Sequence, residues 1–171
     1  MILEIRKAGP ADVDDILEVT KDAFTTYAES MGMPEKVVAL RETPQTVLAE
    51  MKKKTVLVGT VNNKIIGTIR FETIPGNIAY ITRFGVSSKI RKSGIGTMLI
   101  EEVAAYARQE GITAIALHTC TKIIPLVRFY YGQGFYIHST TQDRGYVRGL
   151  FLKELTSETH ETIDLTYASK L

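Results

Sequence analysis

Three consecutive β-rich runs followed by a glycine-rich turn into a helix constrain the fold of this chain more than any other feature. Residues 55–61, 65–74 and 78–86 are rich in β-branched and aromatic residues, and the breaks between them hold an Asn-Asn pair and a Pro-Gly-Asn triplet. Both breaks favour tight hairpin turns, so the three runs predict an antiparallel meander. Just beyond the third run the apolar period lengthens from two residues to between three and four, which indicates a helix.

This helix leads directly into another β-rich run. Its apolar pattern covers residues 95–106 and stops at Gly111, and the run 114–119 follows at once. A strand, a helix and a second strand in this order form a crossover unit, whose two strands lie parallel in one sheet. We therefore expect residues 78–86 and 114–119 to be parallel neighbours.

The two ends of the chain add elements around this centre. We expect strands at 2–6, 135–139 and 147–155, and helices at 10–24, 44–54 and 124–131. The predicted fold class is α/β in the α+β sense, a mixed and mostly antiparallel sheet of about seven strands flanked by helices. We expect one domain over residues 1–155 and assign no structure to the tail 156–171.

Composition limits the classes of function. The 171 residues are 44% apolar and carry a net charge of +2, which suits one packed core and provides no global field for nucleic acid. The single cysteine, Cys120, excludes an internal disulfide and a cysteine-based metal cage, and we expect no metal. The N-terminus lacks the apolar region of a signal peptide and no run reaches the roughly 18 residues of a membrane span. The sequence thus predicts a cytoplasmic protein that does not enter membranes.

The turn before the central helix has the features of an anion site. Residues 88–99 read SKIRKSGIGTML, with Arg91 and Lys92 beside Gly94 and Gly96. A helix N-terminus exposes unpaired N–H groups, and glycine lets a phosphate approach the backbone. A nucleotide P-loop needs Gly-Lys-Ser/Thr, and a dinucleotide turn needs a third glycine where Leu99 stands, so both of those alternatives fail. A purely structural turn, with a serine cap and solvated cations, remains the alternative.

Two motifs identify a family resemblance. Residues 86–96, VSSKIRKSGIG, resemble the acetyl-coenzyme A signature of GNAT-type N-acetyltransferases, with Arg91, Gly94 and Gly96 at its fixed positions. Residues 129–135, FYYGQGF, resemble the run that ends the last helix of the same family. Both motifs occur in the family's order, which implies a GNAT-like sheet with a β-α-β acetyl-coenzyme A core.

The resemblance implies acetyl-coenzyme A as cosubstrate and assigns residues to it. The pantetheine arm would pair beside the end of the strand 78–86, and the Val86 N–H would donate to the thioester carbonyl. The backbone of the glycine turn would hold the diphosphate, with Arg91 at its rim. The implied contacts are Phe84, Gly85, Val86, Arg91, Lys92, Ser93, Gly94, Ile95, Gly96 and Thr97.

The resemblance also implies direct transfer of the acetyl group to an amine. Tyr130 occupies the position of the acid that protonates the departing thiolate. A base for the amine is harder to assign: His118 has a suitable pKa but a lone strand histidine is commonly structural, and Glu72 is the other candidate. Cys120, two residues from His118, raises an acyl-cysteine route that the family does not normally use. Ile123 stands where many relatives carry Asn, which puts some coenzyme contacts in question.

The acceptor is expected to be a primary amine on a small molecule or a peptide. In this fold it would enter between the early helices and the last hairpin, opposite the coenzyme. The alternative is a non-catalytic module that binds or senses acyl-coenzyme A. A nucleic-acid role for Lys89, Arg91 and Lys92 is disfavoured, because no aromatic residues are interleaved with these cations. A hairpin edge and the unassigned tail are compatible with a homodimer.

Overall fold

The computed structural model describes residues 1–90 and 92–164 of the chain. Its strands are β1 (Leu3–Lys7), β2 (Thr55–Val61), β3 (Lys64–Ile74), β4 (Ile78–Val86), β5 (Ala114–Cys120), β6 (Tyr136–Thr141) and β7 (Arg148–Glu154). Its α-helices are α1 (Val13–Met31), α2 (Pro44–Lys53), α3 (Ile95–Gln109) and α4 (Ile124–Gly132). Short 3-10 segments occur at Pro10–Asp12, Pro34–Lys36, Val38–Arg41 and Ser88–Ile90.

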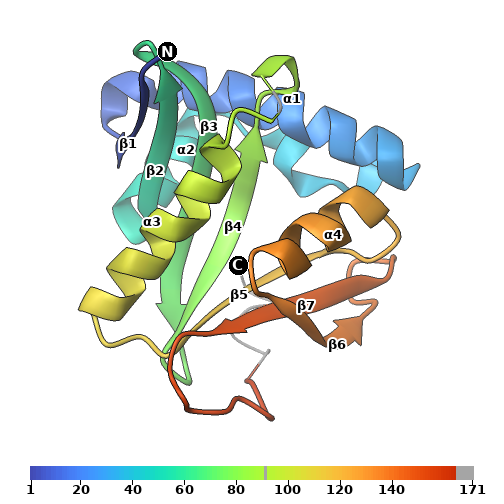
Figure 1. The fold of residues 1–171 in the computed structure, drawn as a ribbon. Coiled ribbons are helices and arrows are strands. Elements are labelled where there is room, and N and C mark those ends of the chain that lie inside the picture. The colour runs from blue at the N-terminus through green and yellow to red at the C-terminus, as the bar shows by residue number, and fades with distance from the viewer. Residues whose placement is uncertain (91, 165–171) are drawn as a thin grey trace. The chain divides into compact units, whose positions relative to one another are not determined.

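The seven strands follow the order β1-β2-β3-β4-β5-β7-β6, and helix α3 connects β4 to β5 (Figure 1). The pairs β1–β2, β2–β3, β5–β7 and β6–β7 are antiparallel, whereas β4 and β5 are parallel, with Tyr80 opposite Ala116. The predicted fold class and the predicted crossover unit are both confirmed.

Most element boundaries differ from the sequence expectation by one or two residues, but the helix expected at 10–24 runs over Val13–Met31 as α1, and α3 continues to Gln109. Strand β1 begins one residue later, and β6 runs over Tyr136–Thr141 rather than 135–139. A register irregularity between Ile137 and Ser139 accompanies the pairing of β6 with β7. At the first hairpin, Asn62 and Asn63 adopt φ values of 48° and 68°, the left-handed conformations that a tight hairpin turn requires.

The chain divides into two compact units, residues 1–71 with 83–102, and residues 72–82 with 103 onward. In the first unit, helices cover both faces of strands β2 and β3. Apolar side chains of α1 and α2 pack with Val56, Val58 and Ile65 on one face. The start of α3 covers the opposite face, and Figure 1 shows its ribbon in front of β2 and β3 with α2 behind them.

Two glycines let the start of α3 lie directly on this sheet. Ile95 is fully buried, and a Cβ atom added to Gly59 or Gly67 would lie 2.7 or 2.8 Å from its Cγ2. No carbon atom fits at such a distance, so both strand positions must lack a side chain. The first residue of α3 is therefore fixed in a notch between the two strands.

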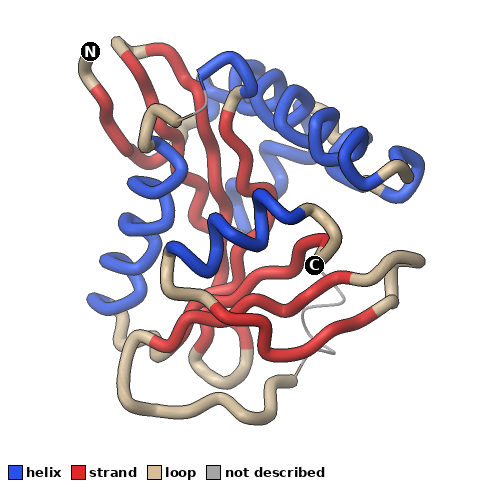
Figure 2. Tube along the Cα trace, turned by 45° about the vertical axis from the view of Figure 1, so that its right-hand side comes forward, coloured by secondary structure: helices blue, strands red, loops and turns tan. Residues whose placement is uncertain are grey.

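In the second unit, helix α4 lies along the antiparallel strands β5, β7 and β6 (Figure 2). The ring of Tyr130 in α4 packs on Phe151 of β7 with centroids 5.3 Å apart. Leu150 and Leu152 alternate with Phe151 and so face the other side of the sheet, where they join a core that includes Ile78.

The described part of the C-terminal tail packs on this same unit. Ile163 contacts the core around Leu150 and Leu152, and His160 is only 7% exposed, with its Nε2 atom 2.9 Å from the Thr113 hydroxyl. The domain boundary at residue 155 stays a prediction. Within residues 1–90 and 92–164, no helix combines the length and the apolar content needed to cross a bilayer.

Substitution Gly67→Ala should destabilise the first unit. The new methyl group would meet Cγ2 of Ile95 at 2.8 Å and Cδ1 of Leu99 at 3.1 Å, and a β-branched isoleucine has little freedom to move aside. We expect a loss of about 1–3 kcal/mol in the free energy of unfolding, measured by urea denaturation. The control is Gly132→Ala, where nothing lies within 4 Å of the added atom and stability should not fall. An equal change in the free energy of unfolding in the two variants would contradict the close packing of Ile95 against Gly67.

Candidate functional site

The predicted anion site lies at the junction of β4 and α3 in the first unit. Helix α3 opens after Gly94, whose carbonyl accepts the first helical hydrogen bond, from the Met98 N–H at 3.0 Å. Gly94 has a φ of 88°, and among residues 1–90 and 92–164 no atom lies within 4 Å of a Cβ built there. The positive φ of Gly94 is a backbone conformation that suits glycine. Because glycine has no side chain, this residue does not block access to the N–H groups of the first helical turn.

The side chains around this turn divide into two kinds. Ile95 contributes only backbone to the turn, because its side chain is buried against Gly59 and Gly67. Lys92 is exposed and has a φ of 63°, an uncommon conformation for a residue other than glycine. The predicted contact Arg91 lies outside the described residues.

The end of β4 is held in place by α1 and β3. The Asp22 carboxylate accepts hydrogen bonds from the Ser88 N–H at 2.6 Å and from the Ser88 hydroxyl at 2.8 Å, and these bonds hold the pKa of Asp22 below its usual value. The Ser87 N–H donates to the Ile66 carbonyl at 2.7 Å. Asp22 was missed in the sequence because it lies 66 positions from its partner, with no local signal.

The predicted contacts on β4 itself show two different environments. A Cβ atom on Gly85 would lie 2.7 Å from the Cβ of Ala23, so this glycine is required for the close approach of α1. Its packing role is independent of any ligand. Phe84 and Val86 are half-buried on either side of it.

In the second unit, His118 of β5 lies beside Tyr80 of β4. The Tyr80 hydroxyl is 2.5 Å from His118 Nδ1, and the ring centroids are 5.7 Å apart. Sequence reasoning found His118 but missed Tyr80, although it placed both strands side by side. The register supplies the missing information: Tyr80 pairs with Ala116, and His118 lies two residues further on the same face.

Burial keeps both members of this pair neutral. Burial and then the positive charge of Arg148 lower the pKa of His118 to about 4, and burial raises the pKa of Tyr80 to about 12. At neutral pH the phenol holds its proton and the imidazole is uncharged. The pair can therefore pass a proton along its hydrogen bond, but His118 by itself is a weak base.

The other two predicted catalytic residues also belong to the second unit. Tyr130 is 5% exposed among the rings of Phe129, Phe135 and Phe151, and burial raises the pKa of its phenol above the usual range. Glu72 is half-buried, and its Oε1 atom is buried without a hydrogen-bond partner in the described part of the chain.

Two further findings concern the accessibility of Cys120 and the grouping of residues that could bind a metal ion. Cys120 is 2% exposed at the end of β5, so its thiol has little access to solvent. No group of three or more His, Cys, Asp or Glu side chains suited to a metal ion occurs in residues 1–90 and 92–164.

Known proteins share both the sequence pattern and the fold. N-alpha-acetyltransferase 60 of Xenopus tropicalis is 31% identical over an alignment of 142 residues, which covers 74% of this chain and 57% of that protein. The chain thus matches less than two thirds of that relative's length.

Two solved structures show the same fold at low sequence identity. The PaiA N-acetyltransferase of Thermoplasma acidophilum, in complex with coenzyme A, superposes with a TM-score of 0.79 at 21% identity, over 90% of this chain and 99% of that one. The ribosomal-protein-S18-alanine N-acetyltransferase of Escherichia coli gives a TM-score of 0.73 at 12% identity, over 95% and 99%.

The family model that matches describes the acetyltransferase (GNAT) family, and it covers residues 15–151, most of the chain. That span contains the glycine turn, the crossover from β4 to β5 and helix α4 with Tyr130. On this match, the chain belongs to the GNAT acetyltransferase family.

Proposed function

We propose that this protein transfers the acetyl group of acetyl-coenzyme A to the α-amino group of an acceptor. The observation that carries the proposal is the turn at Gly94, where a helix anchored by the buried Ile95 starts without a side chain, in a backbone conformation suited to glycine. Helix N-termini of this kind bind phosphate through their N–H groups and the helix dipole. The match to the GNAT family and the fold shared with a coenzyme A complex support the same ligand.

The residues that would hold the cosubstrate are those of the turn and of the end of β4. The backbone of residues 92–97 would bind the diphosphate, and Arg91 would add a cation at its rim. The Val86 N–H would donate to the thioester carbonyl, and a donor in this role is worth roughly 3 kcal/mol in the transition state. The Asp22–Ser88 hydrogen bonds would keep this strand end in position.

In the transfer, the amine nitrogen attacks the thioester carbonyl carbon and the bond from carbon to sulfur breaks. Tyr130, which keeps its proton at physiological pH, would protonate the leaving sulfur and recover a proton from solvent. The amine must lose a proton as the new bond forms, and the Tyr80–His118 pair would accept it and release it to water. Glu72, with its unpartnered Oε1, remains the alternative acceptor of this proton.

The weakness of His118 as a base favours an α-amine over a lysine side chain. An α-amino group has a pKa of about 8, so about a quarter of it is neutral at pH 7.5, whereas a lysine amine with a pKa of about 10.4 is neutral in roughly one molecule in a thousand. A pair built on a histidine with a pKa of about 4 can assist the first but can hardly deprotonate the second. The name of the relative, an N-alpha-acetyltransferase, agrees with this choice.

Acetyl-coenzyme A should stabilise the wild-type protein against heat. At a ligand concentration of about one hundred times Kd, the expected gain is about 2.7 kcal/mol, visible as a shift in Tm. Gly94→Glu places a bulky anion where the diphosphate would bind and should abolish the shift. Gly111→Glu is the matched control, since Gly111 follows the other end of α3, also has a positive φ (70°) and also has no atom of the described part of the chain within 4 Å of an added Cβ. A full shift in Gly94→Glu would refute the proposed site.

The pH dependence of kcat/KM should follow the titration of the acceptor amine and not that of His118. Because burial lowers the pKa of His118 to about 4, this histidine stays neutral from pH 5.5 to 9. For an α-amine acceptor, log kcat/KM should rise with unit slope up to about pH 8, the pKa of the amine, without an inflection near 6.5. An inflection near 6.5 that disappears in His118→Gln would contradict the buried, neutral state of the ring.

Tyr130→Phe should lower kcat by roughly a hundredfold while leaving the stabilisation by acetyl-coenzyme A unchanged, because the variant lacks only the proton donor. Tyr131→Phe is the control, since Tyr131 is 50% exposed and its hydroxyl accepts a hydrogen bond from the Ile137 N–H at 3.2 Å. Free-thiol release measures turnover. Absence of turnover in the wild type across a broad panel of amines, with ligand binding intact, would favour the non-catalytic sensing function instead.

A further inference from the structure

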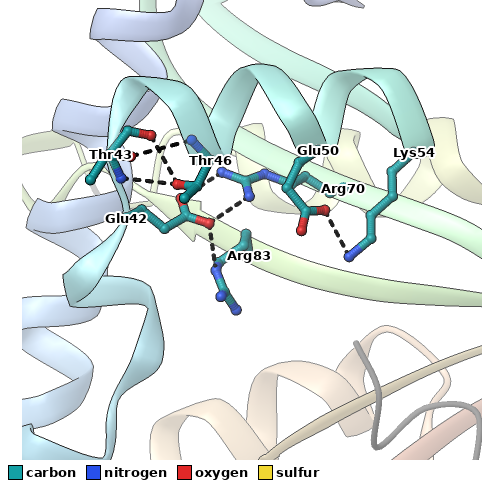
Figure 3. Close-up of polar contacts among 7 residues, drawn as sticks. All are labelled: Glu42, Thr43, Thr46, Glu50, Lys54, Arg70 and Arg83. Atoms are coloured by element: carbon teal, nitrogen blue, oxygen red, sulfur yellow. Dashed lines mark hydrogen bonds and ion pairs between the residues drawn. The ribbon is translucent and has the colours of Figure 1, made fainter.

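The first unit contains a buried ionic cluster in which one carboxylate lies between two guanidinium groups (Figure 3). Arg70 donates from Nη1 and Nη2 to the two oxygens of Glu42, at 2.7 and 2.8 Å. Arg83 of β4 donates from Nε to Oε1 of the same carboxylate, at 3.0 Å. The side chains of Arg70, Glu42 and Arg83 are 0%, 6% and 19% exposed.

The charges in this cluster do not balance. Burial by itself would raise the pKa of Glu42, but the hydrogen bonds and charges of Arg70 and Arg83 outweigh it and hold that pKa below its usual value. The carboxylate is therefore ionised, and the cluster carries one negative and two positive charges. Arg70 already engages both carboxylate oxygens in a fork, so Glu42 does not need Arg83 for neutralisation.

Both the backbone and the side chain of Arg83 are held in unusual positions. Its backbone φ is 49°, a left-handed conformation inside a strand, which is uncommon for a residue with a long side chain. Glu42 fixes only its Nε, and Figure 3 shows the two terminal nitrogens directed away from that carboxylate. No other acidic side chain among residues 1–90 and 92–164 forms an ion pair with Arg83. A largely buried, pre-positioned guanidinium with a free fork is a strong receptor for a carboxylate.

We infer that the terminal nitrogens of Arg83 bind an anionic group of the acceptor, so that the preferred acceptor is an α-amine with a carboxylate close to it. This inference rests on the proposed function. Arg83 lies three residues before Val86 on β4, so it precedes the proposed thioester position, whereas the diphosphate would bind after it at residues 92–97. The carboxylate can come from two sources: the α-carboxylate of a free amino acid, or an acidic side chain next to the N-terminus of a peptide.

Matched acceptors test the inference and separate these sources. The first pair is L-methionine and L-methioninamide, and the second is a C-terminally amidated peptide beginning Met-Asp and its Met-Asn counterpart. We expect the anionic member of one pair to be preferred by about tenfold or more in kcat/KM, through KM, when kcat/KM is calculated on the concentration of neutral amine, because the two members of a pair differ in amine pKa. Preference in the first pair identifies a free amino acid, and preference in the second identifies a peptide. Equal kcat/KM within both pairs would overturn the inference.

Substitution of Arg83 should remove the preference selectively. In Arg83→Gln the anionic acceptor should lose its advantage while the neutral acceptor keeps its kcat/KM, and Arg83→Lys should restore part of the preference. The control is Arg41→Gln, which removes the same charge beside Glu42; Arg41 is exposed and donates to the Glu35 carbonyl at 3.3 Å. Thermal unfolding checks that each variant is folded. An equal loss for both acceptors in Arg83→Gln would show a purely structural role.

A binding measurement without turnover keeps the inference separate from the proposed function. In protein labelled with 15N-arginine, titration with acetate should shift the Arg83 Nε–H resonance, assigned by its absence in Arg83→Gln, to saturation. The Arg41 resonance should move only slightly. If Arg83 does not respond to acetate, or responds no more than Arg41, the anion site is wrong, whatever the outcome with acetyl-coenzyme A. A protein that fails to bind acetyl-coenzyme A but shows saturable acetate binding at Arg83 would refute the proposed function alone.

Discussion

The contact of Ile95 with two glycines is the constraint on which the rest of the first unit depends. Gly59 and Gly67 leave a notch in strands β2 and β3, and the side chain of Ile95 fills it. The neighbouring residue, Gly94, has the opposite property, since no atom of the described residues lies within 4 Å of a Cβ built there. One residue anchors the helix and the residue before it leaves the helix end open, so core packing determines where an anion can meet the backbone.

The second unit holds three largely buried aromatic groups that are neutral at physiological pH. Tyr80, His118 and Tyr130 are all shifted by burial toward their uncharged forms. Such groups suit a reaction in which a neutral amine attacks and a thiolate leaves, because a proton is lost at one point and gained at another. In the proposed function they would also limit the acceptor, since only an amine with a low pKa would arrive in its neutral form often enough.

The first unit holds a buried ionic cluster around Glu42. A buried carboxylate with a single arginine would be a closed ion pair, whereas the second arginine leaves a guanidinium with free donors beside the strand that leads to Val86. A buried ion pair contributes little net stability by itself, because desolvation offsets the attraction. The extra arginine, held in a left-handed backbone conformation, is more readily explained by recognition than by stability.

The periodicity and the turn residues of the sequence determined the order of strands and helices, the parallel crossover from β4 to β5 and the position of the glycine turn, because these follow from local rules of period and backbone freedom. Tyr130 was found only through the resemblance of its motif to the family, and His118 through its place on the predicted strand 114–119. Asp22, Tyr80 and the Glu42–Arg70–Arg83 cluster appeared only in the tertiary structure. Their partners lie between 28 and 66 positions away in the chain, so only strand register and helix packing decide that these side chains meet.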